Sequence, residues 1–275
     1  MVKKFLRYAA ALGFAAFMTS GGLSGLNAYG TTISCDTGCS LQYLIDNPDS
    51  TIQVGDKLFY NFEASSFASG GATAVSLTNV IVTPLTTTGP LGHTEFGLQF
   101  AITAGNSVSA GQGKDIVLEF NVTTTFGDNR IVDDYLAFSG GVDGSGEVNI
   151  SETVTNENGQ NIPASIGGNA SLYVYQDINV SKPTDFALFD PQDILHINKD
   201  INWFALTTCR DNPNLECTDR AFISHFTQLF SQLPPDTTGG SSGNSTGQIP
   251  EPASMLLLGL GLAGLGIARR KQSTK

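Results

Sequence analysis

Alternating apolar and polar positions between Tyr29 and Leu233 predict β-strands for most of this region. The clearest segments place apolar residues at alternate positions, as in a strand with one buried face: 96–102, 116–122 and 148–154. Weaker alternation adds four further segments: 52–62, 74–83, 131–138 and 171–176. Turn-forming clusters such as Ser69-Gly70-Gly71 separate the segments. Many short strands with regular turns predict a mainly β fold, an antiparallel β-sandwich or jelly-roll-like ectodomain over residues 29–233.

Two segments depart from this pattern. Leu41–Asp46 is expected to form one helical turn, which ends at Asn47-Pro48 because the residue before a proline avoids the helical conformation. The segment Arg220–Leu233 fits both the helical and the strand period. Its apolar residues at 222, 226, 229 and 233 would share one helical face, and those at 222, 226 and 230 would share one face of a strand. We predict a final strand here that closes the sandwich.

The N-terminus has the composition of a secretory signal peptide. A short apolar run over 8–18 follows three basic residues: Lys3, Lys4 and Arg7. The run is too short for a stable transmembrane helix, and small residues follow it up to Ala28, the candidate cleavage position. We therefore expect residues 1–28 to direct the chain to the Sec translocon and to be removed.

The C-terminal segment 249–275 has three parts. It begins with a triplet that can continue neither a helix nor a sheet ladder: Pro250, Glu251 and Pro252. The apolar run Ala253–Ala268 follows and lies at the short limit for a transmembrane helix, where about 20 residues are usual. A basic tail over 269–275 opens with three cations that would stay on the cytoplasmic side: Arg269, Arg270 and Lys271.

This tripartite tail resembles the PEP-CTERM sorting signal of Gram-negative bacteria, the substrate tag of exosortase-type transpeptidases. The resemblance implies export, transient tethering in the inner membrane through the helix 253–268, and processing by an exosortase at Pro-Glu-Pro. It also implies delivery to the cell surface or the extracellular matrix. Segments such as 41–46 and 50–59 look like those of exported β-rich proteins with this tail, whose ectodomains have no established catalytic role. An ordinary single-span protein that keeps its tail stays open as the alternative.

Segment 234–248, between the ectodomain and the sorting signal, is predicted to be a flexible linker. Its sequence, PPDTTGGSSGNSTGQ, cannot form a core. Such a spacer lets a folded domain stand clear of the membrane while the tail reaches its processing enzyme.

The charge of the chain shifts on processing. The net charge is −11, from 14 basic and 25 acidic residues. Removal of residues 1–28 and of the tail after Pro252 takes seven basic residues and no acidic one, which leaves a net charge of −18. Nucleic acid is excluded as a partner for such a surface. The acidity suits solubility outside the cell, attraction of divalent cations, or association with polysaccharide.

Four cysteines form two close pairs, Cys35 with Cys39 and Cys209 with Cys217. Export brings them to an oxidising compartment, where an even number favours disulfides. Pairing within each cluster is the simplest of three connectivities, and pairing across the clusters stays open. A zinc site fits poorly because these spacings are not those of a zinc finger, so no metal site is predicted.

No catalytic residue is predicted. The three histidines, His93, His196 and His225, lie in no catalytic motif and have no second histidine at metal-ligand spacing. No Gly-x-Ser-x-Gly elbow frames a serine nucleophile. Carboxylate pairs suited to glycoside cleavage exist, but sequence does not give the separation that the mechanism requires: Asp133 with Asp134, and Glu147 with Glu152.

Two features favour binding. The stretch Asp143–Glu147 resembles part of a calcium loop but lacks the repeated acids of an EF-hand, so calcium between β-loops is an alternative to the expectation of no cofactor. Four aromatic residues are the candidates for a sugar-stacking platform, although aromatic residues in strands more often pack in the core or across strands: Tyr173, Tyr175, Trp203 and Phe204.

Together these features predict an exported, non-enzymatic surface or matrix protein associated with exopolysaccharide and with biofilm or floc formation. A carbohydrate- or calcium-binding surface module is the alternative, and a secreted hydrolase is a third class.

Overall fold

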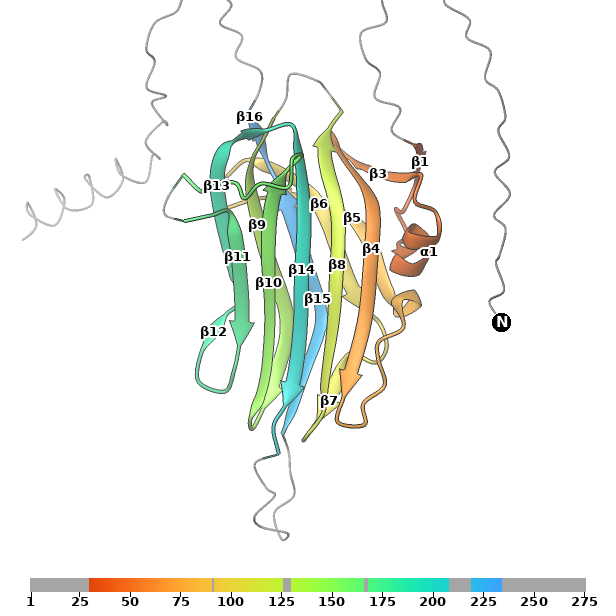
Figure 1. Cartoon of the computed structure of the whole chain (residues 1–275), viewed down its shortest axis with the longest axis vertical. Helices are drawn as coiled ribbons and strands as arrows, with labels where there is room; N and C mark the ends of the chain where they lie inside the picture. The colour runs from red at the N-terminus through yellow and green to blue at the C-terminus, as the bar shows by residue number, and fades with distance from the viewer. Residues whose placement is uncertain (1–29, 91, 126–129, 166–167, 208–218, 234–275) are drawn as a thin grey trace, which may run out of the picture. The chain divides into compact units, whose positions relative to one another are not determined.

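The computed structural model describes residues 30–90, 92–125, 130–165, 168–207 and 219–233, whose strands form two eight-stranded sheets (Figure 1). The first sheet has the strand order β1 (Thr31–Ile33), β3 (Ser50–Val54), β4 (Lys57–Ser69), β8 (Gly113–Thr124), β14 (Ile194–Ala205), β10 (Gly146–Asn156), β11 (Ser171–Gln176) and β12 (Ser181–Lys182). Strands β10, β14, β8 and β4 lie in front in Figure 1, with the second sheet behind them.

The second sheet has the order β13 (Thr184–Gln192), β9 (Arg130–Asp143), β15 (Arg220–Phe230), β6 (Thr94–Ile102), β5 (Val80–Thr88) and β2 (Cys39–Ser40). Two short strands complete it: β7 (Ser107–Ser109) on β15 and β16 (Gln232–Leu233) on β9. The helical elements are α1 (Leu41–Asp46) and a 3₁₀ turn, η1 (Leu77–Asn79). The fold is thus a β-sandwich, as predicted, in which the short pair β1–β3 is parallel and the other named strand pairs are antiparallel.

The predicted alternation places one face of each central strand in the core. On β8, every apolar residue of the pattern is at most 1% exposed: Ile116, Leu118, Phe120 and Val122. The Phe120 ring contacts Phe62 of the same sheet at a centroid distance of 5.6 Å and Phe100 of the second sheet at 5.9 Å. Phe100 stacks on Phe226 at 4.7 Å. Aromatic packing of this kind stabilises the contact between the two sheets.

The two ambiguous segments adopt the predicted structures. Helix α1 covers Leu41–Asp46, and the predicted closing strand forms as β15 (Arg220–Phe230), followed by the short β16. One detail of the prediction is wrong: Phe222 does not share a face with Phe226, because the register with β9 shifts between Ile223 and His225. A β-bulge inserts one residue there and moves the following side chains to the opposite face.

A cluster of four polar residues interrupts the apolar layer between the sheets. This inter-sheet cluster takes one residue from each of four central strands, all at most 2% exposed: Asp134 (β9), Glu152 (β10), Lys199 (β14) and Gln228 (β15). Lys199 forms an ion pair with Glu152 and donates a hydrogen bond to Gln228. The Gln228 amide in turn donates to Asp134 and, at 3.1 Å, to Glu152. The two sheets are therefore joined by hydrogen bonds as well as by apolar contact.

Burial changes the protonation of this cluster. It lowers the pKa of Lys199 to about 7, against the opposing effect of the Asp134 charge. It raises the pKa of Asp134 to about 8, against the opposing effect of the Lys199 charge. Near neutral pH the Asp134 carboxyl is therefore largely protonated, which reduces the negative charge held between the sheets.

The predicted signal peptide, linker and sorting signal (1–28, 234–248 and 249–275) lie outside the described residues. Among the residues that the structure describes, none forms a helix of the length and apolarity that a membrane crossing requires.

Candidate functional site

The solvent-facing side of the first sheet is covered by polar side chains in ordered rows. Strand pairing aligns Thr153, Asn198 and Glu119 across β10, β14 and β8, and Glu63 of β4 continues this row. The adjacent row is Thr155, His196 and Asn121, again on β10, β14 and β8. Since side chains alternate along a strand, both rows lie on the face opposite the core.

These rows line a surface cavity of about 610 Å³, which we name the polar groove. Its principal polar residues come from three strands: Asn61, Glu63, Glu119, Asn121, His196 and Asn198. They lie far apart in the sequence, and only the register of β4, β8 and β14 brings them together.

A β-bulge in β4 shapes one wall of the groove. The register of β4 on β8 shifts between Tyr60 and Glu63, and Asn61 within the bulge has a positive φ of 55°. Asparagine adopts this left-handed conformation more readily than most residues. Bulges redirect side chains, and Asn61 here lines the groove.

Hydrogen bonds within the groove hold its side chains in place. Asn198 Nδ2 donates to Glu119 Oε1 at 2.7 Å, and His196 Nδ1 is hydrogen-bonded to Asn121 Oδ1. Each bond uses only part of the capacity of an amide, an imidazole or a carboxylate. The groove therefore offers donors and acceptors side by side, which suits a ligand rich in hydroxyl groups.

A second part of the same face carries a close carboxyl pair. Burial raises the pKa of Asp115 to about 6, and the charge of Asp200 and a hydrogen bond to it contribute in the same direction. Asn202 donates to Asp200 at 2.6 Å. These three residues extend the polar surface from the groove along β8 and β14.

The four candidate stacking residues separate into two sets. Tyr173 and Tyr175 stack at a centroid distance of 5.6 Å on β11, and Tyr173 is 43% exposed. Phe204 faces outward on β14, where it lines a second cavity. Trp203 is fully buried and has the same strand parity as Ile201, so it belongs to the core, as expected for most aromatic residues in strands.

Sequence reasoning missed one aromatic residue on this face. Phe67 of β4 is 56% exposed and lies opposite Asp115 in the strand register. The clear alternation in β4 stops after Phe62, which faces the core. Phe67 lies five residues further on, and an odd separation along a strand places a side chain on the opposite face. This separation was the one signal in the sequence that Phe67 faces outward.

The members of the two carboxylate pairs have different surroundings in the structure. Asp133 accepts hydrogen bonds from the backbone N–H and the hydroxyl of Ser231, and Asp134 belongs to the inter-sheet cluster. Glu147 lies outward on β10 while Glu152 is buried on the inner face, so the strand separates them.

Glu95, at the start of β6, is a buried carboxylate that the sequence did not single out. It is 1% exposed, and neither carboxylate oxygen has a hydrogen-bond partner among the described residues. Burial, and then the charges of Asp133 and Asp134, raise the pKa of Glu95 to about 7. Glu95 therefore titrates near neutral pH, well above the ordinary range of a glutamate.

The histidines lie apart: His196 in the groove, His225 on β15, and His93 just before β6. No group of three or more potential metal ligands occurs within the described ranges of the chain. The turn Asp143–Glu147 joins β9 to β10, where Ser145 N–H donates to Asp219 at 2.9 Å.

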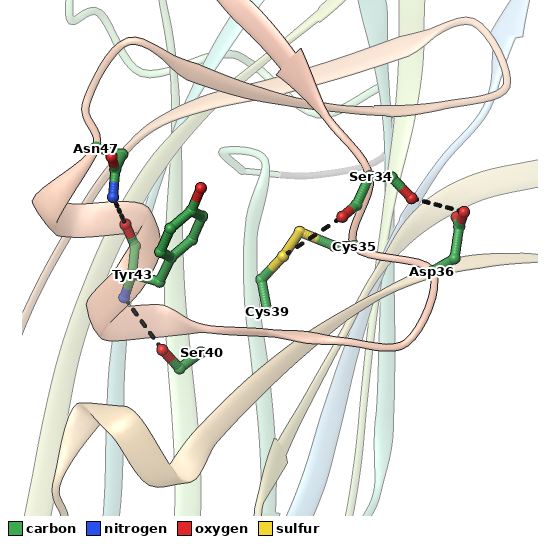
Figure 2. Close-up of a disulfide and its surroundings, with 7 residues drawn as sticks. All are labelled: Ser34, Cys35, Asp36, Cys39, Ser40, Tyr43 and Asn47. Carbon is green, nitrogen blue, oxygen red and sulfur yellow. Dashed lines mark hydrogen bonds between the residues drawn. A yellow bond between two sulfur atoms is a disulfide. The ribbon is translucent and has the colours of Figure 1, made fainter.

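The Cys35–Cys39 disulfide forms as the local pairing predicts. Figure 2 shows it beside the start of α1, where the Ser40 hydroxyl accepts a hydrogen bond from Tyr43 N–H at 3.2 Å. At the other end of α1, Asn47 donates to the Tyr43 carbonyl at 2.8 Å. The disulfide therefore anchors the loop before α1, and Cys209 and Cys217 lie outside the described residues.

A family model of the PEP-CTERM protein-sorting motif matches residues 248–271. The chain carries a PEP-CTERM sorting motif. The matched range contains all six of the predicted signal residues: Pro250, Glu251, Pro252, Arg269, Arg270 and Lys271. The motif marks the protein for export and surface sorting and implies an exosortase as its processing partner.

No curated protein matches the chain. A comparison with solved structures matches TmCBM61 in complex with β-1,4-galactotriose, at 12% identity and a TM-score of 0.25, covering 60% of this chain and 88% of that one. The family 11 carbohydrate-binding module from Clostridium thermocellum, in complex with a β-1,3-1,4-mixed-linked tetrasaccharide, has 11% identity, a TM-score of 0.19 and coverages of 62% and 87%. The enzymatically active domain of bacteriophage CBA120 tailspike protein 4 has 15% identity, a TM-score of 0.21 and coverages of 62% and 19%. TM-scores this low carry no information about the ligand, so the ligand is inferred from the residues of this chain alone.

Proposed function

We propose that this protein is an exported, non-catalytic surface or matrix protein whose β-sandwich binds polysaccharide through the polar groove. In this proposal residues 1–28 are the signal peptide, residues 29–233 bind the ligand, and residues 234–248 form a spacer. The helix 253–268 holds the chain briefly in the inner membrane of a Gram-negative bacterium until exosortase cleaves at Pro-Glu-Pro. Association with the extracellular polysaccharide then supports biofilm or floc formation.

The polar groove is the observation that supports this function. A sugar hydroxyl both donates and accepts hydrogen bonds, and the groove supplies amides, an imidazole and carboxylates on one rigid sheet. Sites on strands hold such groups more precisely than loops do. Calcium remains a second candidate only through the acidity of the face, and no built ion site supports it within the described ranges.

Groove variants test the binding function. Replacing His196 or Asn121 with alanine should weaken binding of the extracellular polysaccharide about tenfold, because each variant removes hydrogen bonds to the ligand and frees its partner in the groove. Affinity electrophoresis of the exported protein in gels containing the polysaccharide measures this. His225→Ala, on the second sheet, is the matched control and should bind like the wild type. Equal losses in all three variants, or hydrolysis of the polymer, would contradict the proposal.

Processing is tested separately. Intact-mass analysis of the surface-released protein should find a form that lacks the C-terminal peptide ending in Lys275, because the tail acts as a removable signal. Replacing Glu251 and both flanking prolines with alanine should leave the tail attached, while the same changes in the linker at Ser241, Ser242 and Gly243 should not. Mature wild-type protein that still ends in Lys275 would show that the chain is an ordinary single-span protein.

A further inference from the structure

Exposed aromatic residues occur at both edges of the face that carries the polar groove. Tyr173 and Tyr175 of β11 lie at one edge, and Phe67 of β4 lies towards the other, with Phe204 of β14 between them. Tyr173 and Phe67 are 43% and 56% exposed. Single exposed apolar side chains are ordinary, but aromatic rings placed at both edges of one polar face provide stacking surfaces for a ligand.

The strand register aligns one row of residues across the sheet between these two aromatic ends. Strand pairing aligns Tyr175, Asn149, Asn202, Asp115 and Phe67 across β11, β10, β14, β8 and β4. We name these five residues the aromatic-ended row. Neighbouring strands are about 4.8 Å apart, so the row spans roughly 19 Å. This length accommodates several sugar rings in an extended chain.

A second cavity lies at the Phe67 end of the row. It has a volume of about 370 Å³ and is lined by Phe67, Asp115, Asn202 and Phe204 among others. Two aromatic rings, an amide and a carboxyl thus surround one space. Such a mixture matches a pyranose ring, which has an apolar C–H face and a rim of hydroxyl groups.

The outward-facing charges on the four central strands of this face are all negative. Outward positions of β4, β8, β14 and β10 carry five carboxylates: Glu63, Asp115, Glu119, Glu147 and Asp200. The three lysines of these strands, Lys57, Lys114 and Lys199, are buried. Lys114, which also lines the second cavity, donates a hydrogen bond to the Gly105 carbonyl at 2.7 Å. Lys182 of β12, opposite Tyr175, is ion-paired with Asp185 at 2.9 Å. A ligand bearing carboxylates would be repelled across the middle of the row.

We propose that the outer face of the first sheet binds an extended neutral polysaccharide at a second subsite, where the polymer crosses the strands along the aromatic-ended row. This row lies about 13 Å from the polar groove along β14, measured from Asn198 to Asn202. The rings of the polymer stack on Tyr173 and Tyr175 at one edge and on Phe67 and Phe204 at the other. Asn149 and Asn202 bond hydroxyl groups between these ends, and the carboxylates select against uronic acid polymers. This inference rests on the proposed polysaccharide-binding function and specifies the class and direction of its ligand.

The test uses two polymers with the same backbone and different charge, hydroxyethyl cellulose and carboxymethyl cellulose, together with the neutral and anionic fractions of the extracellular polysaccharide. Affinity electrophoresis of the exported protein should show stronger retardation by the neutral fraction and by hydroxyethyl cellulose. Tyr173→Ala and Phe67→Ala should each weaken this binding about three- to tenfold, since each removes a stacking ring. Tyr43→Ala, which removes a 46% exposed ring from α1, is the matched control and should bind normally. Circular dichroism melting checks that every variant folds.

The outcomes separate the two proposals. Neutral binding that is lost at Tyr173 and Phe67, and kept at Tyr43, supports the aromatic-ended row. Binding that depends on His196 and not on either aromatic residue overturns the row and leaves the polar groove as the site. Equal or stronger binding of the anionic polymers overturns the neutral class. Absence of binding to every polysaccharide overturns the proposed function itself.

Discussion

Replacing Lys199 with methionine should lower the free energy of unfolding by about 3–5 kcal/mol, because the variant leaves Glu152 buried between the sheets without its cation. Methionine fills a similar volume, so the loss reports the electrostatic contact rather than a cavity. Urea unfolding followed by tryptophan fluorescence measures it, since Trp203 lies in the same strand and is fully buried.

Two further variants identify the cause of that loss. Lys199→Met combined with Glu152→Met should recover much of the stability, because it removes both charges together and leaves Asp134, which burial keeps protonated near neutral pH. Lys182→Met removes a partly exposed ion pair with Asp185 and should cost less than about 1 kcal/mol. A loss in Lys199→Met no larger than in Lys182→Met would show that the inter-sheet cluster contributes little.

The ectodomain should become less stable as the pH rises from about 4.5 to 7. The pKa of Glu95 is about 7 in the folded protein and about 4.3 in the unfolded chain, so the folded state binds the proton more tightly. Its contribution to stability is therefore complete below about pH 4.3 and is lost as the pH rises to 7.

Asp134, with a pKa raised to about 8, changes the stability in the same direction as Glu95. Lys199, whose pKa is lowered to about 7, opposes this trend only above that pH. Thermal melting between pH 4.5 and 8 should show a decrease of more than about 1 kcal/mol, or roughly 2–4 °C.

A substitution at Glu95 isolates this effect. Glu95→Gln removes the charge and keeps the shape, so its melting temperature should exceed that of the wild type at pH 7.5 and match it at pH 4.5. Glu157→Gln, in the exposed turn after β10, is the control and should follow the wild type at both pH values. Wild-type stability that increases between pH 5 and 7 would contradict the assignment.

Periodicity predicted the fold because it depends on local alternation. Ile116, Leu118 and Phe120 follow a period of two and are buried in the structure as expected. Helix α1 was also predictable, since Asn47-Pro48 ends it within one short segment. The bulges in β4 and β15 were not predictable in this way, because an inserted residue changes the register without changing composition.

The binding face was less predictable, because it depends on strand pairing. His196, Asn121 and Asn61 become neighbours in one groove only through the register of three strands. Lys199 and Glu152 stand at positions of their strands whose side chains face the core. The sequence alone does not show which partners neutralise charged residues at such positions. The sorting motif was fully predictable from the sequence, because the order and spacing of its residues are local, and a family model matches them directly.

Nuclear magnetic resonance of the isotope-labelled exported protein, titrated with the neutral extracellular polysaccharide, tests the central claim most directly. The account predicts shifts of the side-chain amide signals of Asn61, Asn121 and Asn198 and of the His196 imidazole, all of which lie on the outer face of the first sheet. Signals of the second sheet, such as the imidazole of His225, should stay unchanged. Shifts confined to the second sheet, or no shifts at saturating polysaccharide, would contradict the account.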